Sequence, residues 1–497
     1  MFFSIGSVII DDIVLPDGQT RMGVLGGGAT HAAIGLRVWS DRVGVCAAVG
    51  RNFPESLRAE LAGAFDLRGL LTRAAPTPRA WQLFERDGRR TEVFRSDFDE
   101  FLAISPQPAE LATALAGAEG VHLECGAPDP LREWVARFRA EGCQVILWEP
   151  WELALQPQNH ALFRELAPLV DVVSPNLLEA QHFTGLTDPH EIAAALLGDG
   201  ARAVALRMGE RGSLVAGSNG VMTAIPIVPV KKIVDVTGAG NAYCGGFVVG
   251  LAETGDLTQA GRYGAVAASF ALEQFGAMIP LDGLRAEAER RLGALSLPNP
   301  RRLVFDRLAA TWGAYSAPPD LNMKLNRITA AGSIRAGGRL LDLGTGTGAL
   351  TPALLDHQPA VIFAADLSAA MLGQLRQKFG GQAGVQPLAA DGERLPLESE
   401  SIDAAFCHAV FPHFPDKRAA LDEIKRVIRR GGRLVISHPL GRDQVNAIHH
   451  RAADVILRQD VLPPAGEVIV MLAESGWRVV ETADEETLFL IVAEKLV

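Results

Sequence analysis

Residues 341–348 read Leu-Asp-Leu-Gly-Thr-Gly-Thr-Gly and lie between an apolar run and a helical pattern. Glycines at alternate positions let the backbone turn tightly and come close to a ligand. The GxGxG spacing departs from the GxGxxG fingerprint of dinucleotide-binding folds. Taken alone, the stretch fits an ordinary βα turn as well as it fits a ligand-binding loop. In either case it predicts a strand that ends in a turn and continues into a helix.

Two further acids follow at the ends of later apolar segments. Asp366 closes the next segment, and Asp391-Gly392 follows the one after that. A carboxylate at the end of the second strand can accept two hydrogen bonds from ribose hydroxyls. Asp391 is placed to receive an adenine amino group. Together with Asp342, these acids predict a nucleoside that lies across the carboxyl edge of the sheet.

Seven apolar segments in this region have the length of strands, and helical stretches are expected between the first six. Only the acidic turn 483–486 joins the last two, and it is too short for a crossover helix. We therefore expect a seven-stranded sheet whose last strand is antiparallel. The predicted strands lie at residues 339–343, 361–365, 386–389, 403–407, 433–437, 478–482 and 487–492.

Residues 303–497 resemble the class I S-adenosylmethionine-dependent methyltransferases. Residues 341–348 match the first motif of that family, Asp366 its ribose acid and Asp391-Gly392 its adenine contact. Residues 423–433 are similar to the family's E..RVL.PGG helix and turn, with arginine in place of the proline. The resemblance implies a Rossmann-like sheet and methyl transfer to a small molecule. It places S-adenosylmethionine on Asp342, Gly344, Gly346, Gly348, Asp366, Asp391 and Gly392.

Methyl transfer from a sulfonium needs little acid–base chemistry, because the donor carries its own activation and the protein supplies proximity and alignment. No catalytic base follows from the motifs. His438 is the strongest candidate to face the acceptor, because it ends a predicted strand at the carboxyl edge. Residues 305–312 resemble the lid helix of small-molecule methyltransferases, or else they form a packing helix. The other histidines that fit either the acceptor site or an ordinary packed or surface position are His408, His413, His449 and His450.

A second glycine-rich stretch, residues 235–247, reads Asp-Val-Thr-Gly-Ala-Gly-Asn-Ala-Tyr-Cys-Gly-Gly-Phe. A Gly-Ala-Gly turn ahead of a helix exposes several backbone N–H groups, and the helix dipole adds partial positive charge. This arrangement favours a bound anion and suits phosphoryl transfer.

The region around this stretch alternates apolar strands with helical segments, which predicts a mostly parallel sheet covered on both faces. In residues 80–95, apolar and polar side chains alternate on both sides of Asp87-Gly88. This pattern predicts an antiparallel hairpin, a flap that would lie over a site. The predicted strands of the sheet include residues 43–49, 120–123, 144–148, 171–174 and 203–206.

Residues 1–290 resemble the ribokinase-like, PfkB-type sugar kinases, whose D-x-x-G-A-G-D pattern matches residues 235–241 except at the last position. Residues 26–33 resemble the family's substrate loop. The resemblance implies an α/β/α sandwich with a small β flap over residues 1–295, and a homodimer formed through that flap. It implies substrate binding at Asp11, Gly27, Gly28 and His31. It also implies ATP, with Mg²⁺ if the domain is active, on Asn176, Glu179, Gly238, Ala239 and Gly240.

Two residues depart from that family's pattern. Its final Asp is the general base that deprotonates the sugar hydroxyl, whereas this chain has Asn241, whose amide cannot accept a proton at neutral pH. His31 replaces an Asn of the substrate loop, and this replacement changes which pattern of substrate hydroxyl groups the loop can recognise. In one alternative the domain still transfers phosphate slowly, either by positioning alone or with Asp235 or another acid in place of the base. In a second it belongs to a family subgroup that uses different chemistry. In the remaining alternative it is a pseudokinase that binds sugar or nucleotide and regulates the methyltransferase.

Composition narrows the class of protein further. The net charge of −11 over 497 residues argues against a nucleic-acid partner, because phosphate binding needs a basic surface. Five scattered cysteines without a CxxC pair argue against a disulfide framework and against a metal site. No basic leader and no membrane-length apolar stretch occurs, so we expect a cytoplasmic protein that binds no membrane. Residues 295–302, with two prolines, mark the boundary between the two predicted domains.

Overall fold

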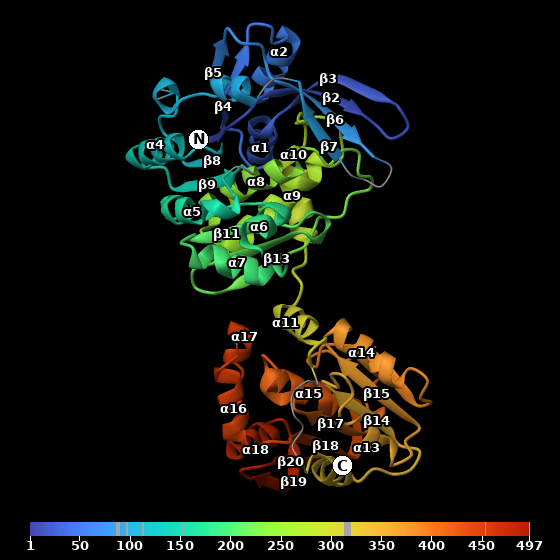
Figure 1. Cartoon of the computed structure of the whole chain (residues 1–497). Coiled ribbons are helices and arrows are strands. Elements are labelled where there is room, and N and C mark those ends of the chain that lie inside the picture. The colour runs from blue at the N-terminus through green and yellow to red at the C-terminus, as the bar shows by residue number, and fades with distance from the viewer. Residues whose placement is uncertain are drawn as a thin grey trace. The chain divides into compact units, whose positions relative to one another are not determined.

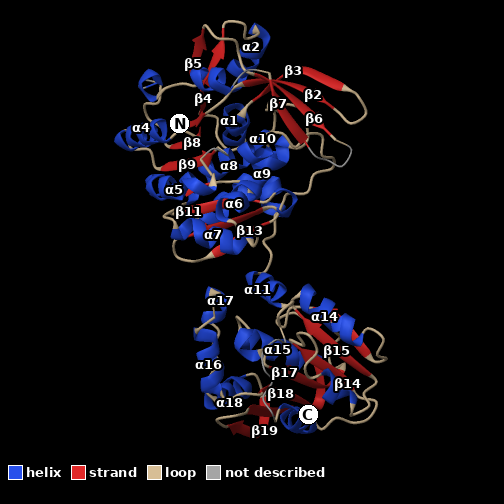
Figure 2. Ribbon diagram, in the orientation of Figure 1, coloured by secondary structure: helices blue, strands red, loops and turns tan. Residues whose placement is uncertain are grey.

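The computed structural model describes residues 1–85, 90–95, 98–111, 114–151, 154–312, 320–452 and 454–496. The chain forms two compact units, Met1–Pro298 and Asn299–Val497 (Figure 1). Each unit combines a strand layer with surrounding helices (Figure 2). In the described part of the chain, no helix combines the length and the apolar character needed to cross a membrane.

A nine-stranded sheet forms the centre of the first unit, in the order β13-β12-β11-β10-β9-β8-β1-β4-β5. All neighbouring strands pair parallel except β12 and β13, which continue the sheet antiparallel. The five predicted strands are confirmed as β4, β8, β9, β10 and β11. The bounds are β1 (Phe2–Ile5), β4 (Val43–Gly50), β5 (Asp66–Arg73), β8 (Gly120–Cys125), β9 (Val145–Pro150), β10 (Val172–Val173), β11 (Ala203–Arg207), β12 (Ser213–Gly217) and β13 (Met222–Ile225).

Helices cover both faces of this sheet, which confirms the predicted α/β/α sandwich. Every residue of β4 is buried, as expected of a strand with helices on both sides. One apolar core packs against α1 (Gly28–Arg37), α2 (Glu55–Ala64), α8 (Ala239–Thr254), α9 (Leu257–Ala271) and α10 (Leu284–Ala294). The core on the other face packs against α4 (Pro128–Ala140), α5 (His160–Leu166), α6 (Leu177–Thr184) and α7 (Pro189–Gly198).

A separate four-stranded sheet forms the flap, in the order β3-β2-β6-β7. The predicted hairpin is confirmed by the antiparallel pairing of β6 with β7, while its expected turn residues, Asp87-Gly88, lie outside the described residues. Helix α3 (Phe98–Ile104) follows the flap. The flap strands are β2 (Ile9–Val14), β3 (Thr20–Gly26), β6 (Arg79–Phe84) and β7 (Arg90–Phe94).

The second unit contains the predicted seven-stranded sheet, in the order β16-β15-β14-β17-β18-β20-β19. The last strand, β20, pairs antiparallel with both β18 and β19, which confirms the expectation from the short acidic turn. β18 begins earlier than predicted, because a register shift lets Ile428 pair before the bulge that precedes Arg433. The bounds are β14 (Arg339–Leu343), β15 (Val361–Asp366), β16 (Val385–Ala389), β17 (Ile402–His408), β18 (Ile428–His438), β19 (Trp477–Asp484) and β20 (Phe489–Lys495).

One predicted helix of this unit is absent. Residues 390–401, between β16 and β17, form turns and a short bridge between Asp391 and Arg394. Gly392 and Pro396 interrupt helical hydrogen bonding there, so the expectation of a helix was wrong. The helices of this unit are α11 (Pro300–Leu308), α12 (Leu321–Ala331), α13 (Thr351–Leu355), α14 (Ala369–Phe379), α15 (Lys417–Val427), α16 (Arg442–His450), α17 (Val455–Arg458) and α18 (Ala465–Glu474).

Helices α1 and α8 pack closely, and each begins at one of the glycine loops of the first unit. A β-carbon at Gly245 of α8 would collide with the carbonyl oxygen of Ala32, and one at Gly35 of α1 with that of Ala242. These glycines therefore set the spacing of the two helices and of the loops they carry.

We predict that Gly245→Ala lowers the stability of the first domain by about 1–3 kcal/mol, because the helices must separate. Thermal unfolding of the full chain measures this effect. Gly293→Ala in α10 is the matched control: its β-carbon would meet no atom within 4 Å, so stability should be unchanged or slightly higher. Equal stability of the Gly245→Ala variant and the wild type would contradict the prediction.

Candidate active sites

A cavity of about 1310 Å³ lies at the carboxyl ends of the first sheet. Strands β8 and β9 contribute Glu124 and Glu149 to its wall, and the flap contributes Asp11 and Gln82. The volume exceeds the usual range for one small ligand, roughly 300–1,000 Å³. The cavity therefore suits two ligands held side by side.

The predicted anion loop forms one wall of this cavity. Gly238 adopts the left-handed conformation with φ of 71°, and α8 begins directly after it without a side-chain cap. The first N–H groups of α8 are therefore available to an anion. Arg207 packs against this loop, because a β-carbon at Gly240 would collide with its guanidinium group. Arg207 carries no motif in the sequence, and its role here comes from the fold alone.

Asn241, at the family's base position, donates a hydrogen bond from Nδ2 to Oε2 of Glu149 at 3.0 Å. Glu149 also pairs with Arg207 at 2.6 Å and with Nε2 of His122 at 2.7 Å. Burial alone would raise the pKa of Glu149, but Arg207, His122 and Asn241 together lower it to about 2. This carboxylate is a weak base that three donors already occupy, so it does not replace the missing aspartate.

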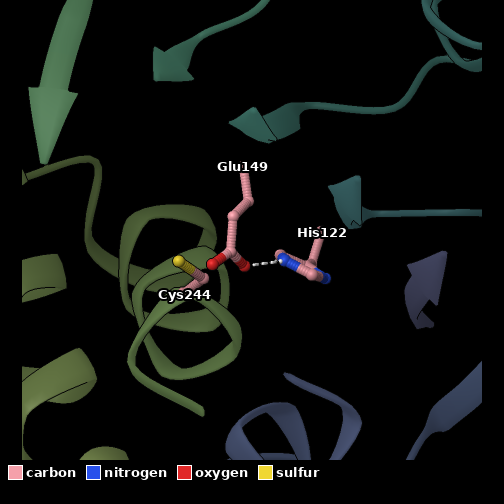
Figure 3. A group of neighbouring side chains, drawn as sticks. All are labelled: His122, Glu149 and Cys244. Carbon is pink, nitrogen blue, oxygen red and sulfur yellow. Dashed lines mark hydrogen bonds and ion pairs between the residues drawn. The ribbon is translucent and has the colours of Figure 1, made fainter. Parts of the chain in front are cut away.

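The same carboxylate belongs to a buried group whose donor atoms all lie within 4.8 Å of one another: His122, Glu149 and Cys244 (Figure 3). Such residue types can bind a transition metal. Here the Arg207 cation already pairs with Glu149, and the Cys244 thiol lies 3.4 Å from the Ser174 hydroxyl. Burial also raises the pKa of this thiol, which disfavours the thiolate that a metal needs. The group fits a buried hydrogen-bond network better than a cation site.

Asp235, the expected substitute for the base, is buried next to the anion loop. Its Oδ1 accepts the N–H of Thr237 at 2.7 Å. Its Oδ2 has no partner among the described residues and is shielded from solvent. Asp235 is also not among the described residues that line the cavity. An acceptor in the cavity would not reach this carboxylate without a movement of the loop.

Two further carboxyl groups of the cavity, Asp11 and Glu124, form no ion pair with a cation among the described residues. Asp11 accepts a hydrogen bond from Gln82 at 3.0 Å, and burial raises its pKa to about 7. Glu124 accepts from the N–H and the hydroxyl of Ser7, at 3.0 and 3.2 Å. Burial, and then the charge of Glu149, raise the pKa of Glu124 to about 7. The sequence analysis did not predict Glu124 as a site residue, because its position near the end of a strand was the only feature that pointed to it.

The remaining predicted residues of the first site also line the cavity. Gly27 and Gly28 open α1, and a β-carbon at Gly28 would collide with the carboxyl group of Glu124. His31 is buried with both ring nitrogens unpartnered among the described residues, and burial lowers its pKa to about 4. Asn176 and Glu179 form the capping box of α6, each side chain accepting the backbone N–H of the other residue.

In the second unit, the predicted glycine loop joins β14 to the next helix. Gly344, Gly346 and Gly348 have φ angles of 71°, 56° and 87°, values that favour glycine. Asp342 at the end of β14 accepts the hydroxyl of Thr345 at 2.7 Å, which braces the loop. Burial raises the pKa of Asp342 to about 7.

Asp366 ends β15 beside this loop. Its two oxygens accept the backbone N–H groups of Gly346 and Ser368, both at 2.8 Å. Burial raises the pKa of Asp366, and these two bonds oppose the rise. Asp391 follows β16, the neighbouring strand, and accepts the N–H of Glu393 at 3.1 Å. The structure thus brings Asp342, Asp366 and Asp391 to one edge of the sheet.

Helix α11 lies against this corner. Asp306 accepts the hydroxyl of Ser368 at 2.5 Å and the N–H of Ala370 at 3.1 Å. The indole nitrogen of Trp312 lies 3.3 Å from the position of a β-carbon on Gly346. Phe305 packs edge-on against Trp312. These contacts place residues 305–312 beside the glycine loop, which is compatible both with a lid and with an amphipathic packing helix.

Four of the five candidate histidines gather at the carboxyl edge, since His408, His413 and His449 all contribute to lowering the pKa of His438. Burial is the larger cause, and the pKa of His438 falls to about 3. His450 is exposed. Among the described residues, His413 is the only one of these histidines that binds a carboxylate, that of Asp460, with 2.6 Å between Nδ1 and Oδ2. The sequence offered no signal for Asp460, which lies in a loop after α17.

Comparison with family models assigns both units. Residues 2–283 match the model described as the pfkB family carbohydrate kinase, which is more than half of the chain. The chain belongs to this family. Residues 341–436 match a second model, described as a methyltransferase domain. The chain therefore joins a PfkB carbohydrate kinase domain to a methyltransferase domain, and both resemblances found in the sequence are confirmed.

Individual relatives match one domain each. The cytidine kinase of Thermococcus kodakarensis is 29% identical over 273 residues, which are 55% of this chain and 96% of that enzyme. The demethylmenaquinone methyltransferase of Clavibacter sepedonicus is 31% identical over 156 residues, 31% of this chain and 61% of that enzyme. A candidate ribokinase II from E. coli, solved with ATP and Mg²⁺, shares the fold with a TM-score of 0.50 at 19% identity. That match covers 59% of this chain and 99% of the E. coli chain.

The raised pKa of Glu124 predicts a pH-dependent stability of the first domain. The ordinary pKa of 4.5 rises to about 7 on folding, so the folded protein holds this proton more tightly. Stability is then lost as the pH rises from about 4.5 to 7. Glu124→Gln should remove the loss and stabilise the domain at pH 8 by up to roughly 3 kcal/mol, with little effect at pH 4.5.

Chemical denaturation of the full chain at both pH values tests this prediction. Glu210→Gln, at an exposed position on the cavity wall, is the matched control and should change stability equally little at both. A pH-independent effect of Glu124→Gln would show that this carboxyl group titrates normally in the folded protein.

Proposed function

We propose that the second domain transfers a methyl group from S-adenosylmethionine to a small molecule. The observation that carries this proposal is the buried carboxylate of Asp366, which binds the N–H of Gly346 in a loop of left-handed glycines. Each of its oxygens keeps a lone pair for a ribose hydroxyl. A β-carbon at Gly346 would approach Trp312, so the glycine leaves space between the loop and the lid. The residues present therefore fit the cofactor.

S-adenosylmethionine supplies an activated methyl group when bound, and the residues of the chain supply alignment. Asp366 would accept the ribose hydroxyls, and Asp391 would accept the adenine amino group. Phe305 and Trp312 of the lid segment would exclude water from the site, which strengthens polar interactions inside it. Asp342 would keep the loop in place through Thr345.

For the first domain we propose binding of ATP with Mg²⁺ and of a sugar or nucleoside. The uncapped start of α8 suits the phosphates, and Asn176 and Glu179 lie on the same cavity. Asp11 and Glu124 offer acceptors for the hydroxyl groups of the second ligand. The similarity to a cytidine kinase favours a nucleoside over a simple sugar.

The surroundings of Asn241 favour a regulatory role as a second candidate function. Glu149 is held by three donors, and Asp235 is shielded, so neither provides the base that Asn241 lacks. Loss of a general base typically costs about 10²- to 10⁴-fold in rate. A domain that binds its ligands but transfers phosphate this slowly would act as a sensor for the methyltransferase.

We further propose that the protein acts in the cytoplasm as a homodimer joined through the flap, without nucleic acid or membrane. All five cysteines are free, which suits a reducing compartment. The edge strand of the flap, β7, is exposed along its whole length, which suits pairing with a second copy. The negative net charge disfavours a nucleic-acid partner.

Titration calorimetry with S-adenosylhomocysteine tests the methyltransferase proposal. Asp366→Asn should weaken binding by about 10- to 100-fold, because charge-assisted hydrogen bonds to the ribose are lost. Asp356→Asn, at an exposed acid in the same domain, should bind like the wild type. A wild-type protein that does not bind this compound would refute the proposal.

A double variant that exchanges the amide and the carboxylate between positions 241 and 149 tests whether the missing general base limits phosphoryl transfer. Asn241→Asp alone places a second carboxylate beside Glu149, and like charges oppose ionisation. The double variant Asn241→Asp with Glu149→Gln keeps a single carboxylate at position 241. We expect ADP formation with cytidine or a panel of sugars and nucleosides to rise about 10²- to 10⁴-fold in the double variant, and less in Asn241→Asp.

Unfolding curves of each variant serve as the control, because Glu149→Gln also removes the partner of the buried Arg207. A wild-type protein as fast as the double variant would show that Asn241 does not limit phosphoryl transfer.

A further inference from the structure

An aspartate–histidine pair lies beside the methyltransferase site. His413 ends the turn Phe411–His413, which follows β17. Asp460 is almost fully buried, and its second oxygen pairs with Arg301 of α11. Burial alone would raise the pKa of Asp460, but His413 and Arg301 outweigh burial and lower it. An ionised carboxylate can only accept, so Nδ1 of His413 carries the proton of their 2.6 Å hydrogen bond.

The opposite nitrogen, Nε2, is then the basic atom of the His413 ring. Among the described residues it forms no hydrogen bond, and 10% of the side chain is exposed. An imidazole whose Nδ1 is bound to a carboxylate and whose Nε2 forms no other hydrogen bond has the arrangement of a general base.

His413 also lies next to the residues proposed to hold the methyl donor. Its ring centroid is 5.0 Å from that of Phe305, in the lid helix. Burial raises the pKa of Asp366, and a charged His413 would oppose that rise. The imidazole packs between the rings of Phe305 and His449, with centroid distances of 5.0 Å to each.

The other three histidines near His413 have lowered pKa values. Burial lowers the pKa of His408 to about 4 and that of His438 to about 3, and it also lowers the pKa of His449. The centroid of His449 is 5.0 Å from that of His413. Among the described residues, the carboxylate of Asp460 is the only one that is hydrogen-bonded to a histidine of this group.

Two cations lie near the pair, Arg301 and Lys417. Arg301 is bound to Asp460, and Lys417 donates to the carbonyl oxygens of Pro412 and Phe414. Neither cation is hydrogen-bonded to Nε2 of His413.

His438, the strongest candidate from the sequence, is less suited to accept a proton. Its Nδ1 accepts the N–H of Leu440 at 3.1 Å, so the proton of the neutral ring lies on Nε2. No described carboxylate binds it, and a group with a pKa of about 3 is a weak base at neutral pH.

We propose that Nε2 of His413 is the general base of the methyl-transfer site and that Asp460 is its positioning residue. The inference rests on the proposed methyltransferase function and narrows its substrate class. The reacting atom of the acceptor carries a proton that must leave, as in a phenol, an enol or an activated carbon–hydrogen bond. An ionised carboxylate would need no such base.

In the reaction, the O–H or C–H bond of the acceptor breaks, and its proton goes to Nε2 of His413. The electron pair left on the acceptor atom forms the bond to the methyl carbon. The carbon–sulfur bond of the donor breaks and leaves its pair on sulfur. The products are the methylated acceptor, S-adenosylhomocysteine and an imidazolium that Asp460 stabilises, so no further reactant is needed.

The tautomer of His413 can be measured without knowledge of the acceptor. Full-length protein with ¹⁵N-labelled histidine and saturating S-adenosylhomocysteine should show the proton of the neutral ring on Nδ1. His413→Asn identifies the signal. Asp460→Ala should move the proton of the His413 ring to Nε2. Asp454→Ala is the matched control, because it also removes an ion pair to α11, that of Asp454 with Arg307, and it should leave the proton on Nδ1. Asp460→Asn provides a milder variant if Asp460→Ala does not fold.

Methyl transfer is then measured with labelled S-adenosylmethionine on phenols and hydroxyquinones, with aliphatic carboxylic acids as the alternative acceptors. We expect the labelled methyl group to appear in the phenols and hydroxyquinones. His413→Asn should lower the rate about 10²- to 10⁴-fold without changing the affinity for S-adenosylhomocysteine, and Asp460→Asn should lower it less. His450→Asn, at an exposed ring, is the matched control.

A wild-type proton on Nε2, an unchanged rate in His413→Asn, or label in carboxylic acids alone would each overturn the assignment of the base. Failure of the wild type to bind S-adenosylhomocysteine would instead overturn the proposed methyltransferase function. The two proposals therefore fail in different measurements.

Discussion

The carboxylate of Asp366 binds two backbone N–H groups at once, that of Gly346 in the glycine loop and that of Ser368 at the start of α14. Burial of an acid is costly, and these bonds compensate part of the cost. Strand, loop and helix therefore meet at one charged group. Asp306 of α11 binds the same corner through Ser368, so the position of α11 also depends on this interaction.

A buried acid also occupies the centre of the first domain, but its charge is neutralised within the protein. Glu149 faces Arg207, His122 and Asn241, all provided by other segments of the chain. An ion pair removed from water persists only when its partners are complete, which explains why an amide at position 241 is compatible with this carboxylate. The two buried acids are held differently: among the described residues, Asp366 accepts two backbone N–H groups, whereas Glu149 accepts from three side chains.

Much of the fold could be predicted because its signals are local. Continuous apolar runs indicated parallel strands, and the acidic turn before β20 indicated the antiparallel end of the second sheet. The predicted helix between β16 and β17 was wrong because Gly392 and Pro396 outweighed the expected alternation of strand and helix. Glu124, Arg207 and Asp460 escaped prediction, because none of them belongs to a repeated or spaced pattern.

The sequence by itself determined the seven strands of the second sheet, where the glycine loops turn, and that Asp342, Asp366 and Asp391 stand at strand ends. These properties depend on periodicity and on φ angles, both set by neighbours along the chain. Tertiary structure decided which of the polar groups remain available to a ligand. Asn241 meets Glu149 across 92 positions, and His413 meets Asp460 across 47. Desolvation and hydrogen bonding depend on such distant partners, so only the folded chain shows that Glu149 is occupied and that one nitrogen of His413 is open.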